Sequence, residues 1–357
     1  KNGPFGSVLH AEDYVDEGMP IVTTEHFKSG NLPLSKNGIP QVSEDDYCRL
    51  KGYMLETDDI VFSRVGSVDI NAHVEHVQQG WLFSGRVLRV RPIKSVNSLC
   101  LHYVLSTESV KRDIRNRAVG QTMPSINTPI LSNTRIYMSQ SEAEQKKIAN
   151  LLSIIDERIA TQNKIIEDLK KLKSAISKKL LCNDKWTTNK IQDIAEIGKG
   201  RVISSVEIDR QKHPLYPVYS SQTSNNGIMG YLDNYMFDGE YITWTTDGAN
   251  AGTVFYRKGK FNCTNVCGTL KIQPKFDCYF VSLVLQQATQ KYVSSNLANP
   301  KLMNNTMASI KIRMPNIETQ KQLSKVFKTL DSCLLVHQRT CKMYLSEKQY
   351  LLCQMFI

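Results

Sequence analysis

Apolar residues recur in heptads over residues 141–181, a stretch that contains neither proline nor glycine. One row contains Ile148, Ile155, Gln162, Leu169 and Ile176, and the other contains Leu152, Ile159, Ile166, Lys173 and Leu180. Ser141 and Glu144 have the spacing of a capping box, which favours a helix start at this point. The heptad pattern predicts a coiled-coil helix, which at about 1.5 Å per residue is on the order of 60 Å long.

A second heptad stretch, residues 316–357, repeats the first after a shift of 175 residues. Asn316, which follows Pro315, is a candidate cap for this helix. The shift aligns three pairs of polar residues: Asp156 with Asp331, Gln162 with His337, and Lys173 with Lys348. We therefore expect the two helices to share a seam. Its predicted residues are Ile148, Leu152, Ile155, Ile159, Gln162 and Ile166 from the first helix, and Leu323, Phe327, Leu330, Leu334 and His337 from the second.

The repeat extends beyond the helices. Residues 59–66 parallel 241–248, residues 84–92 parallel 267–274 with one residue of slippage, and residues 123–126 parallel 299–302. Short strands are predicted at 60–63, 86–91, 241–245 and 269–273, with one helix per copy near 99–116 and 278–293. Such a duplication predicts a mixed α/β (α+β) chain. Its two globular domains, 1–140 and 182–315, are each followed by a long helix, 141–181 and 316–357.

Composition and charge narrow the classes of partner. Apolar residues make up 41% of the chain and charged residues 22%, which is typical of a globular protein. The net charge of +11 favours a polyanionic partner, with nucleic acid ahead of a membrane surface. Residues 1–140 contain 15 basic and 15 acidic residues, yet eight of the basic residues fall within 86–117. Nine scattered cysteines and the lack of a membrane-spanning apolar run predict a cytoplasmic protein with reduced thiols.

Motifs that carry catalysis are missing from the sequence. Gly198-Lys-Gly200 has neither the spacing nor the hydroxyl of a phosphate-binding loop, and no glycine fingerprint for a dinucleotide or S-adenosylmethionine follows a strand. Glu144-Gln-Lys146 has the E-x-K spelling of a nuclease but sits at the start of a coiled coil. His73 with His76, and Cys263 with Cys267, are each half of a tetrahedral metal site. We therefore predict no catalytic residue and no metal site.

Polar loops flanked by basic residues favour DNA instead, because amides and hydroxyls can read base edges while cations contact phosphates. Plain turns and a solvated charged surface are the alternative interpretation of the same residues. The candidates in the first half are Arg64, Ser67, Lys111, Arg112, Arg115, Arg117, Gln121 and Thr122. Those in the second half are Arg201, Ser221, Gln222, Thr223, Asn225, Thr246, Asn250 and Lys301.

This pattern resembles the specificity (S) subunit of type I restriction-modification enzymes over essentially the whole chain. The motifs of the first half are Gly3-Pro-Phe-Gly-Ser7, Gly120-Gln-Thr-Met-Pro-Ser-Ile126 and Gln145-Lys-Lys-Ile148. Those of the second half are Trp186, Gly198-Lys-Gly-Arg201, Tyr219-Ser-Ser221, and Pro315 with Glu318 and Gln320. About fifteen residues, 183–197, precede Gly198, but only two precede Gly3, so the first domain looks clipped at its amino end.

The resemblance implies that each globular domain is a target recognition domain for one half of a split DNA sequence. It also implies that the two helices pack antiparallel as a spacer. Catalysis would then belong to partners: two methyltransferase subunits that use S-adenosylmethionine, and restriction subunits that use ATP and Mg²⁺. No cofactor is expected on this chain. The alternatives are a fragment of a single-chain restriction or modification enzyme, which the missing motifs disfavour, and a non-catalytic coiled-coil adaptor.

Overall fold

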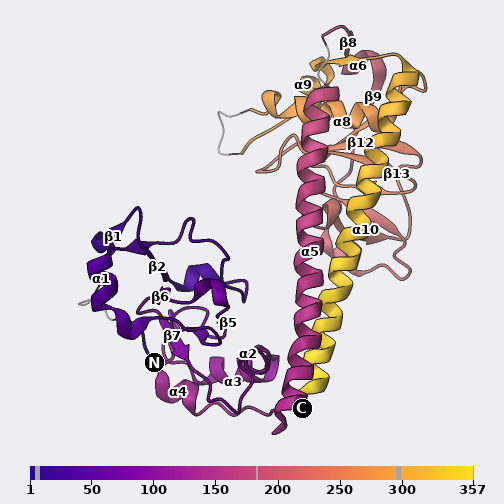
Figure 1. The fold of residues 1–357 in the computed structure, drawn as a ribbon. Helices are drawn as coiled ribbons and strands as arrows, with labels where there is room; N and C mark the ends of the chain where they lie inside the picture. The colour runs from indigo at the N-terminus through magenta and orange to yellow at the C-terminus, as the bar shows by residue number, and fades with distance from the viewer. Residues whose placement is uncertain (5–8, 182–183, 295–298, 357) are drawn as a thin grey trace. The chain divides into compact units, whose positions relative to one another are not determined.

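The computed structural model describes residues 1–4, 9–181, 184–294 and 299–356. The chain divides into two compact units: unit 1, which is Lys1–Asn163 with Arg339–Ile357, and unit 2, which is Lys164–Gln338. Each unit therefore combines one globular domain with part of both long helices, α5 (Glu142–Leu180) and α10 (Ile317–Met355), which Figure 1 labels. Phe5, Gly6 and Ser7 of the first amino-terminal motif lie outside the described residues.

Within its described residues, unit 1 contains two small sheets and, besides the long helices, four short α-helices. One sheet has the order β1-β3-β2-β6, and the other has the order β5-β4-β7. The strands are β1 Tyr14–Val15, β2 Met19–Val22, β3 Gln41–Val42, β4 Ile60–Ser63, β5 Asn71–His73, β6 Leu82–Phe83 and β7 Val87–Val90. The helices are α1 Glu44–Arg49, α2 Ser98–Leu105, α3 Glu108–Arg117 and α4 Thr128–Ser132.

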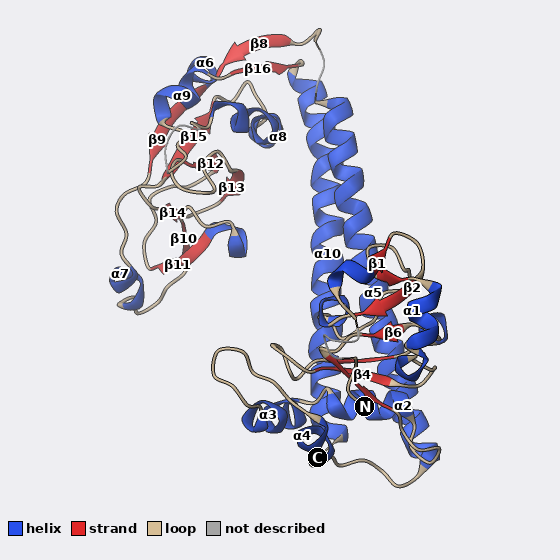
Figure 2. Cartoon of the chain, turned by 90° about the vertical axis from the view of Figure 1, so that its left-hand side faces the viewer, coloured by secondary structure: helices blue, strands red, loops and turns tan. Residues whose placement is uncertain are grey.

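The described part of unit 2 forms three sheets, with the orders β13-β12-β15-β9, β11-β10-β14 and β16-β8 (Figure 2). Five strands are β8 Thr187–Lys190, β9 Ala195–Lys199, β10 Tyr216–Tyr219, β11 Ile228–Leu232 and β12 Glu240–Thr245. The other four are β13 Val254–Lys258, β14 Asn262–Cys263, β15 Cys267–Ile272 and β16 Lys311–Met314. The helices are α6 Ile191–Ile194, α7 Ser205–Asp209, α8 Cys278–Ala288 and α9 Asn304–Ser309.

The central strands of the two units have the same pairing, but the repeat register differs from the predicted one. Ser63 pairs with Val87 in unit 1, and Thr245 pairs with Cys267 in unit 2. Val87, and not Ser84, therefore holds the position of Cys267. The predicted alignment matched the residues that flank the strands, whereas backbone hydrogen bonds set the true register.

The amino end of unit 1 has its own counterpart in unit 2. The N–H of Gly3 donates to Val87 at 3.1 Å, and the N–H of Gly200 donates to Cys267 at the same distance. A Cβ at either glycine would lie 2.0 Å from a backbone oxygen, so both positions require glycine. Gly3 therefore corresponds to Gly200, two residues beyond the Gly198 that the sequence suggested, and Lys1 corresponds to Gly198.

One predicted helix of unit 1 is divided in two. The pattern predicted a helix over 99–116, but α2 ends at Leu105 and α3 begins at Glu108. The Ser106 hydroxyl donates to the carbonyl of His102, and the Thr107 hydroxyl donates to the carbonyl of Val104. Side chains of this type compete with the helix for backbone groups, which explains the break.

The two long helices run antiparallel within each unit. In unit 1 the Nζ of Lys348 on α10 lies 2.6 Å from a carboxylate oxygen of Asp156 on α5. In unit 2 Lys173 on α5 forms the matching ion pair with Asp331 on α10. The residue numbers of each pair add to the same sum, 504, so the helix register is the same in both units. The predicted antiparallel pair is confirmed, as is the mixed α/β fold.

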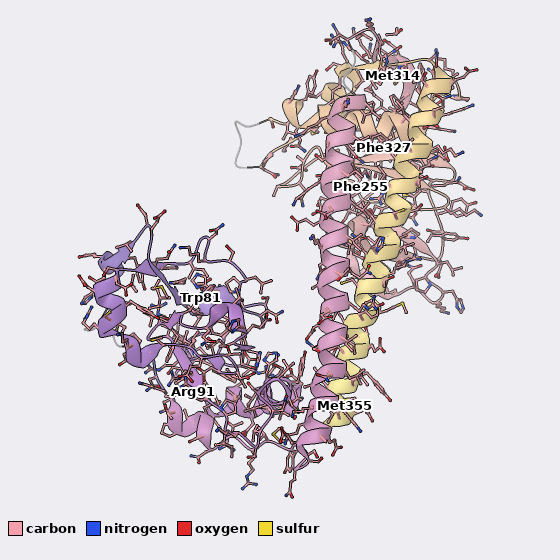
Figure 3. All side chains as sticks on the ribbon, viewed as in Figure 1. Trp81, Arg91, Phe255, Met314, Phe327 and Met355 are labelled. Carbon is pink, nitrogen blue, oxygen red and sulfur yellow. The ribbon has the colours of Figure 1, made fainter. Side chains whose placement is uncertain are left out.

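The seam rows lie on the buried side of each helix. Leu152, Ile155 and Phe327 are buried, and the other predicted seam residues are half-buried. Phe327 belongs to the core of unit 2 beside Leu323 and Leu330 (Figure 3). Leu180, the last residue of its heptad row, is exposed. Among the described residues, no helix is both long and apolar enough to cross a lipid bilayer.

Each globular domain is attached to the helices by the same glutamine. In unit 1 the Oε1 of Gln145 accepts the N–H of Asn97 at 2.7 Å, and its Nε2 donates to the carbonyl of Ser139 at 2.8 Å. In unit 2 the Oε1 of Gln320 accepts the N–H of Asp277 at 2.9 Å. Both side chains are buried, and their bonds link α5 to the start of α2 and α10 to the start of α8.

A tyrosine adds a second attachment in each unit. The Tyr103 hydroxyl of α2 donates to Asp156 at 2.9 Å, and burial, followed by this carboxylate, raises the pKa of Tyr103. The corresponding group in unit 2 consists of Tyr279, Asp331 and Lys173. Tyr103 lies six residues after its helix cap and Tyr279 two, a difference of about one helical turn. The carboxylate is therefore retained in the duplication, whereas the tyrosine has moved along the helix.

Candidate DNA interface

Each unit brings two distant loops together at the end of its central strands. In loop cluster 1, residues 64–69 and 118–126, the N–H of Gly66 donates to Pro124 at 2.8 Å. In loop cluster 2, residues 246–252 and 299–302, the N–H of Gly248 donates to Pro300 at 3.0 Å. Both glycines have a positive φ, +83° and +94°, which favours glycine. The structure thus places equivalent pairs of loops in both units.

Loop cluster 1 presents several of the predicted side chains. Ser67, Gln121 and Thr122 are exposed. Arg64 is half-buried, and its guanidinium donates to the carbonyl of Gly85 at 3.1 Å. Hydroxyl and amide groups therefore lie at the surface, while Arg64 connects this loop to the neighbouring turn.

Helix α3 carries the basic residues of unit 1 next to this cluster. Val110 and Ile114 point into the core, which leaves the charged side chains on the outer side. Arg115 forms an ion pair with Asp69 of loop cluster 1 and another with Glu108, while Arg117 pairs with Asp113. Lys111 is half-buried and Arg112 is exposed. Ion pairing therefore anchors α3 to the loops, and it neutralises part of the predicted positive charge.

A third loop, residues 220–227, joins loop cluster 2. The Nδ2 of Asn250 lies 3.3 Å from the carbonyl of Ser221, which connects the two polar loops predicted from the sequence. Gln222 donates to the carbonyl of Ile228 at the foot of the loop. Thr223, Asn225 and Asn226 are exposed at its tip, and both asparagines have left-handed backbones. Asparagine tolerates this conformation better than most residues do.

Three of the predicted DNA-binding residues of unit 2 are either buried or already paired with a carboxylate. Thr246 is buried, so its side chain has little surface for a ligand. Arg201 is exposed and forms an ion pair with Glu207. Lys301 lies 3.8 Å from Asp247, within loop cluster 2.

Arg257 is a charged residue of this region that the sequence did not reveal. It is 3% exposed on β13, with its guanidinium 3.5 Å from the ring centre of Tyr219 and 4.4 Å from that of Phe255. Its Nε donates to the Thr243 hydroxyl at 3.2 Å. Burial lowers its pKa, and it forms no ion pair with a carboxylate among the described residues. Tyr219 directly precedes loop 220–227, so the packing of Arg257 against the Tyr219 ring supports the start of that loop.

The two residue pairs with the spacing of metal ligands lie in different units, and each pair has its own surroundings. His73 faces Asp58 at 3.2 Å, and Cys263 and Cys267 are buried, which raises the pKa of Cys267 to about 11. Among the described residues, no three histidine, cysteine or acidic side chains gather where they could hold a metal ion. Glu144 accepts a hydrogen bond from Ser139 at the start of α5.

Comparison with known proteins identifies the duplicated unit. The family model for the type I restriction modification DNA specificity domain matches residues 6–171 and 183–342. The specificity subunit of the type I restriction enzyme MpnII of Mycoplasma pneumoniae is 41% identical over 145 residues, 40% of this chain and 43% of that protein. A further protein of that organism, provisionally assigned as a type I specificity subunit, is 38% identical over 185 residues, 51% of this chain and 77% of that protein.

A solved structure has the same fold along the whole chain. The crystal structure of a type I restriction-modification S subunit from M. genitalium has a TM-score of 0.70 and 17% sequence identity, and the match covers 100% of this chain and 93% of that one. The two matched segments of the family model fall in the two halves of the duplication and together cover most of the chain. The chain therefore belongs to the family of type I restriction-modification specificity subunits.

Proposed function

We propose that this specificity subunit reads a bipartite DNA target, one half with each globular domain. Residues 1–140 would form the first recognition domain and residues 182–315 the second, with α5 and α10 as the spacer between them. The observation that carries this proposal is the pair of equivalent loop clusters, which present different side chains on the same backbone framework. We place the subunit in the cytoplasm, with double-stranded DNA as its ligand and no membrane partner.

The chemistry of the clusters suits a duplex. Exposed amides and hydroxyls such as Gln121, Thr122 and Asn225 can hydrogen-bond to base edges in the major groove. Arg112 and the other cations of α3 can contact phosphates beside them. Arg257 supports loop 220–227 without reaching the surface itself, so its contribution to binding is indirect.

We also propose that this chain has no catalysis of its own and holds two methyltransferase subunits and the restriction subunits, which would use S-adenosylmethionine, ATP and Mg²⁺. Leu151 on α5 and Val326 on α10 are our candidates for two equivalent docking sites for the methyltransferase subunits. The two residues are related by the shift of 175, and they are 42% and 46% exposed. Exposed apolar side chains on a helix favour a protein partner. Changing either residue to glutamate should remove one methyltransferase copy, measured as the mass of the complex; an unchanged mass would contradict these sites.

The half-site assignment is tested by the methylated sequence. The chain is expressed with its methyltransferase partner, and the modified adenines are located by sequencing. Gln121→Ala should alter the recognised bases in one half of the target only, and Asn225→Ala should alter those in the other half. Asn37→Ala, an exposed residue outside the clusters, should alter neither. If both loop variants change the same half, one domain does not read one half-site.

A further inference from the structure

A hollow with a cationic rim lies in unit 2 beside the end of α5. Its volume is about 640 Å³, and Leu181 and Val284 line it with buried apolar side chains. Three exposed cations also line it: Lys291, Lys311 and Arg313. Figure 2 labels α8, β8 and β16, the elements around this place. The hollow therefore combines a firm apolar floor with positive charge at the surface.

The positive charge of the hollow is largely uncompensated. Lys311 of β16 is directly opposite Lys190 of β8. Opposite residues of an antiparallel pair have their Cβ atoms about 4.5–5.5 Å apart, and like charges there destabilise the pair. Arg313 forms an ion pair with Asp184, but Lys190, Lys291 and Lys311 form none with the acidic side chains that the structure describes. An anion bound at the rim would relieve this repulsion.

The hollow adjoins loop cluster 2. Lys291 belongs to the turn η6 (Thr289–Tyr292), which follows α8. The buried Thr289 hydroxyl donates to the carbonyl of Gly252 in the cluster at 2.7 Å. A Cβ at Gly252 would lie 2.7 Å from the Val293 side chain just after the turn, so the packing here is close. The turn therefore holds Lys291 next to the loops that we propose to read DNA.

Unit 1 contains a hollow of about 480 Å³ at the equivalent position. Its lining includes Arg135, the counterpart of Lys311, and Phe356, the counterpart of Leu181. The first two residues each precede the repeated Ile-x-Met sequence, and the second two are related by the shift of 175 residues. Arg117 of α3 adds another cation to the lining. Both units thus place cations around the same hollow, although different elements supply them.

We propose that the hollow of unit 2 holds the sugar-phosphate backbone of double-stranded DNA beside the half-site that loop cluster 2 reads. Lys291 and Lys311 contact phosphates, and Lys190 strengthens the positive field around them. Such contacts position a protein on the duplex without reading bases. This inference rests on the proposed function. It supplies unit 2 with phosphate contacts that Arg201 and Lys301, already paired with carboxylates, do not provide freely.

The test compares two double variants of the full chain on duplexes with and without the methylated motif. Lys291→Gln with Lys311→Gln should weaken binding to both duplexes by about 10-fold at 0.1 M salt, and the slope of log K against log salt should fall by roughly 2. Lys271→Gln with Lys275→Gln is the matched control, because both lysines are exposed at or beyond the end of β15 that lies away from loop cluster 2. This control should change neither quantity.

Two further readouts separate charge from folding and from base reading. Lys291→Arg with Lys311→Arg should retain wild-type affinity and slope, because the positive charge is kept. The unfolding temperature of the glutamine variant should not fall, since the substitution removes one member of a like-charge pair. Its methylated motif should equal that of the wild type, whereas Asn225→Ala alters one half-site if the proposed function holds.

Four results would overturn the inference. Equal losses in the glutamine variant and its control would remove the hollow as the contact, and a loss confined to the duplex with the motif would make the lysines base readers. Competition by inorganic phosphate at matched ionic strength would assign the hollow to a small anion. Undiminished DNA binding with weaker association of the methyltransferase would assign it to a protein partner.

Discussion

Arg115 and Arg117 on α3 are exposed, but each is already held by a carboxylate of unit 1. An ion pair at the surface is weak, so a phosphate can compete for these guanidinium groups. Arg115 also connects α3 to Asp69 of loop cluster 1, which keeps it close to the proposed reading surface. At the scale of single residues, these arginines therefore combine an anchoring role with a candidate phosphate contact.

The double variant Arg115→Gln, Arg117→Gln should weaken DNA binding by about 10-fold or more at 0.1 M salt. The slope of log K against log salt should fall by roughly 2, because each phosphate contact contributes about 0.9. Lys28→Gln with Arg49→Gln is the matched control, since these two cations are also exposed and ion-paired within unit 1. Equal losses in both double variants would show that α3 does not carry the basic face.

His102 makes the stability of unit 1 depend on pH. It is buried beside Asn71, whose Oδ1 lies 2.7 Å from its Nδ1. Burial, and next the charge of His73, lower its pKa from 6.5 to about 3. Below pH 6.5 the unfolded chain binds a proton that the folded unit does not accept, so acid favours unfolding.

Unit 1 should therefore lose about 1.4 kcal/mol of stability per pH unit between roughly pH 6 and pH 4 through this residue. Thermal unfolding at pH 7 and pH 5 measures the effect. His102→Gln should reduce this dependence, while His213→Gln, at an exposed position in unit 2, should leave it unchanged. If the unfolding temperature of unit 1 depends on pH in the same way in wild type and in His102→Gln, the buried neutral His102 is not the cause of the acid sensitivity.

At the scale of the elements, one carboxylate per unit ties a globular domain to both long helices. Asp331 on α10 accepts the Tyr279 hydroxyl of α8 at 2.5 Å and pairs with Lys173 of α5. Its removal leaves a half-buried ammonium and a buried hydroxyl without their acceptor, which costs more than the loss of the contact alone.

Asp331→Leu should accordingly destabilise unit 2 by about 1–3 kcal/mol, measured by denaturant unfolding. Glu167→Gln is the control, because Glu167 pairs with Lys171 on the exposed side of α5, and such pairs are worth about 0.5 kcal/mol or less. If both substitutions have the same small effect, the carboxylate does not hold the elements together.

At the scale of the whole molecule, two helices and not one cross the boundary between the units. Helix α5 passes from unit 1 to unit 2 at Asn163–Lys164, and α10 passes back at Gln338–Arg339. Because the two helices of the spacer are paired, both must be lengthened together if the pairing is to be kept.

Four residues inserted at both crossings should keep the seam close to phase and lengthen the spacer by about 6 Å. At about 3.4 Å per base pair, the unread gap of the methylated motif should widen by roughly one or two base pairs, with both half-sites retained. Insertion into α5 alone should instead break the register and lower stability. Altered half-site sequences with an unchanged gap would contradict the spacer proposal.

Local periodicity determined the elements and their duplication. The heptads of 141–181 and 316–357 predicted two long helices, because residues three and four positions apart lie on the same face of a helix. The matching segments of the two halves located the strands of the central sheets to within a few residues. They did not give the correct correspondence between the paired strands of the two units. The resemblance to specificity subunits and the comparisons lead to the same family, because the duplicated pattern extends along the whole chain.

Tertiary structure alone decided which polar residues can act together. Thr246 and Asn250 belong to one loop, yet Thr246 is buried and Asn250 bonds across to Ser221. Arg257 lies on an ordinary strand, and only the packing of Tyr219 and Phe255 around it shows that it supports a loop. Burial and pairing depend on contacts between residues far apart in the chain, which local patterns do not encode.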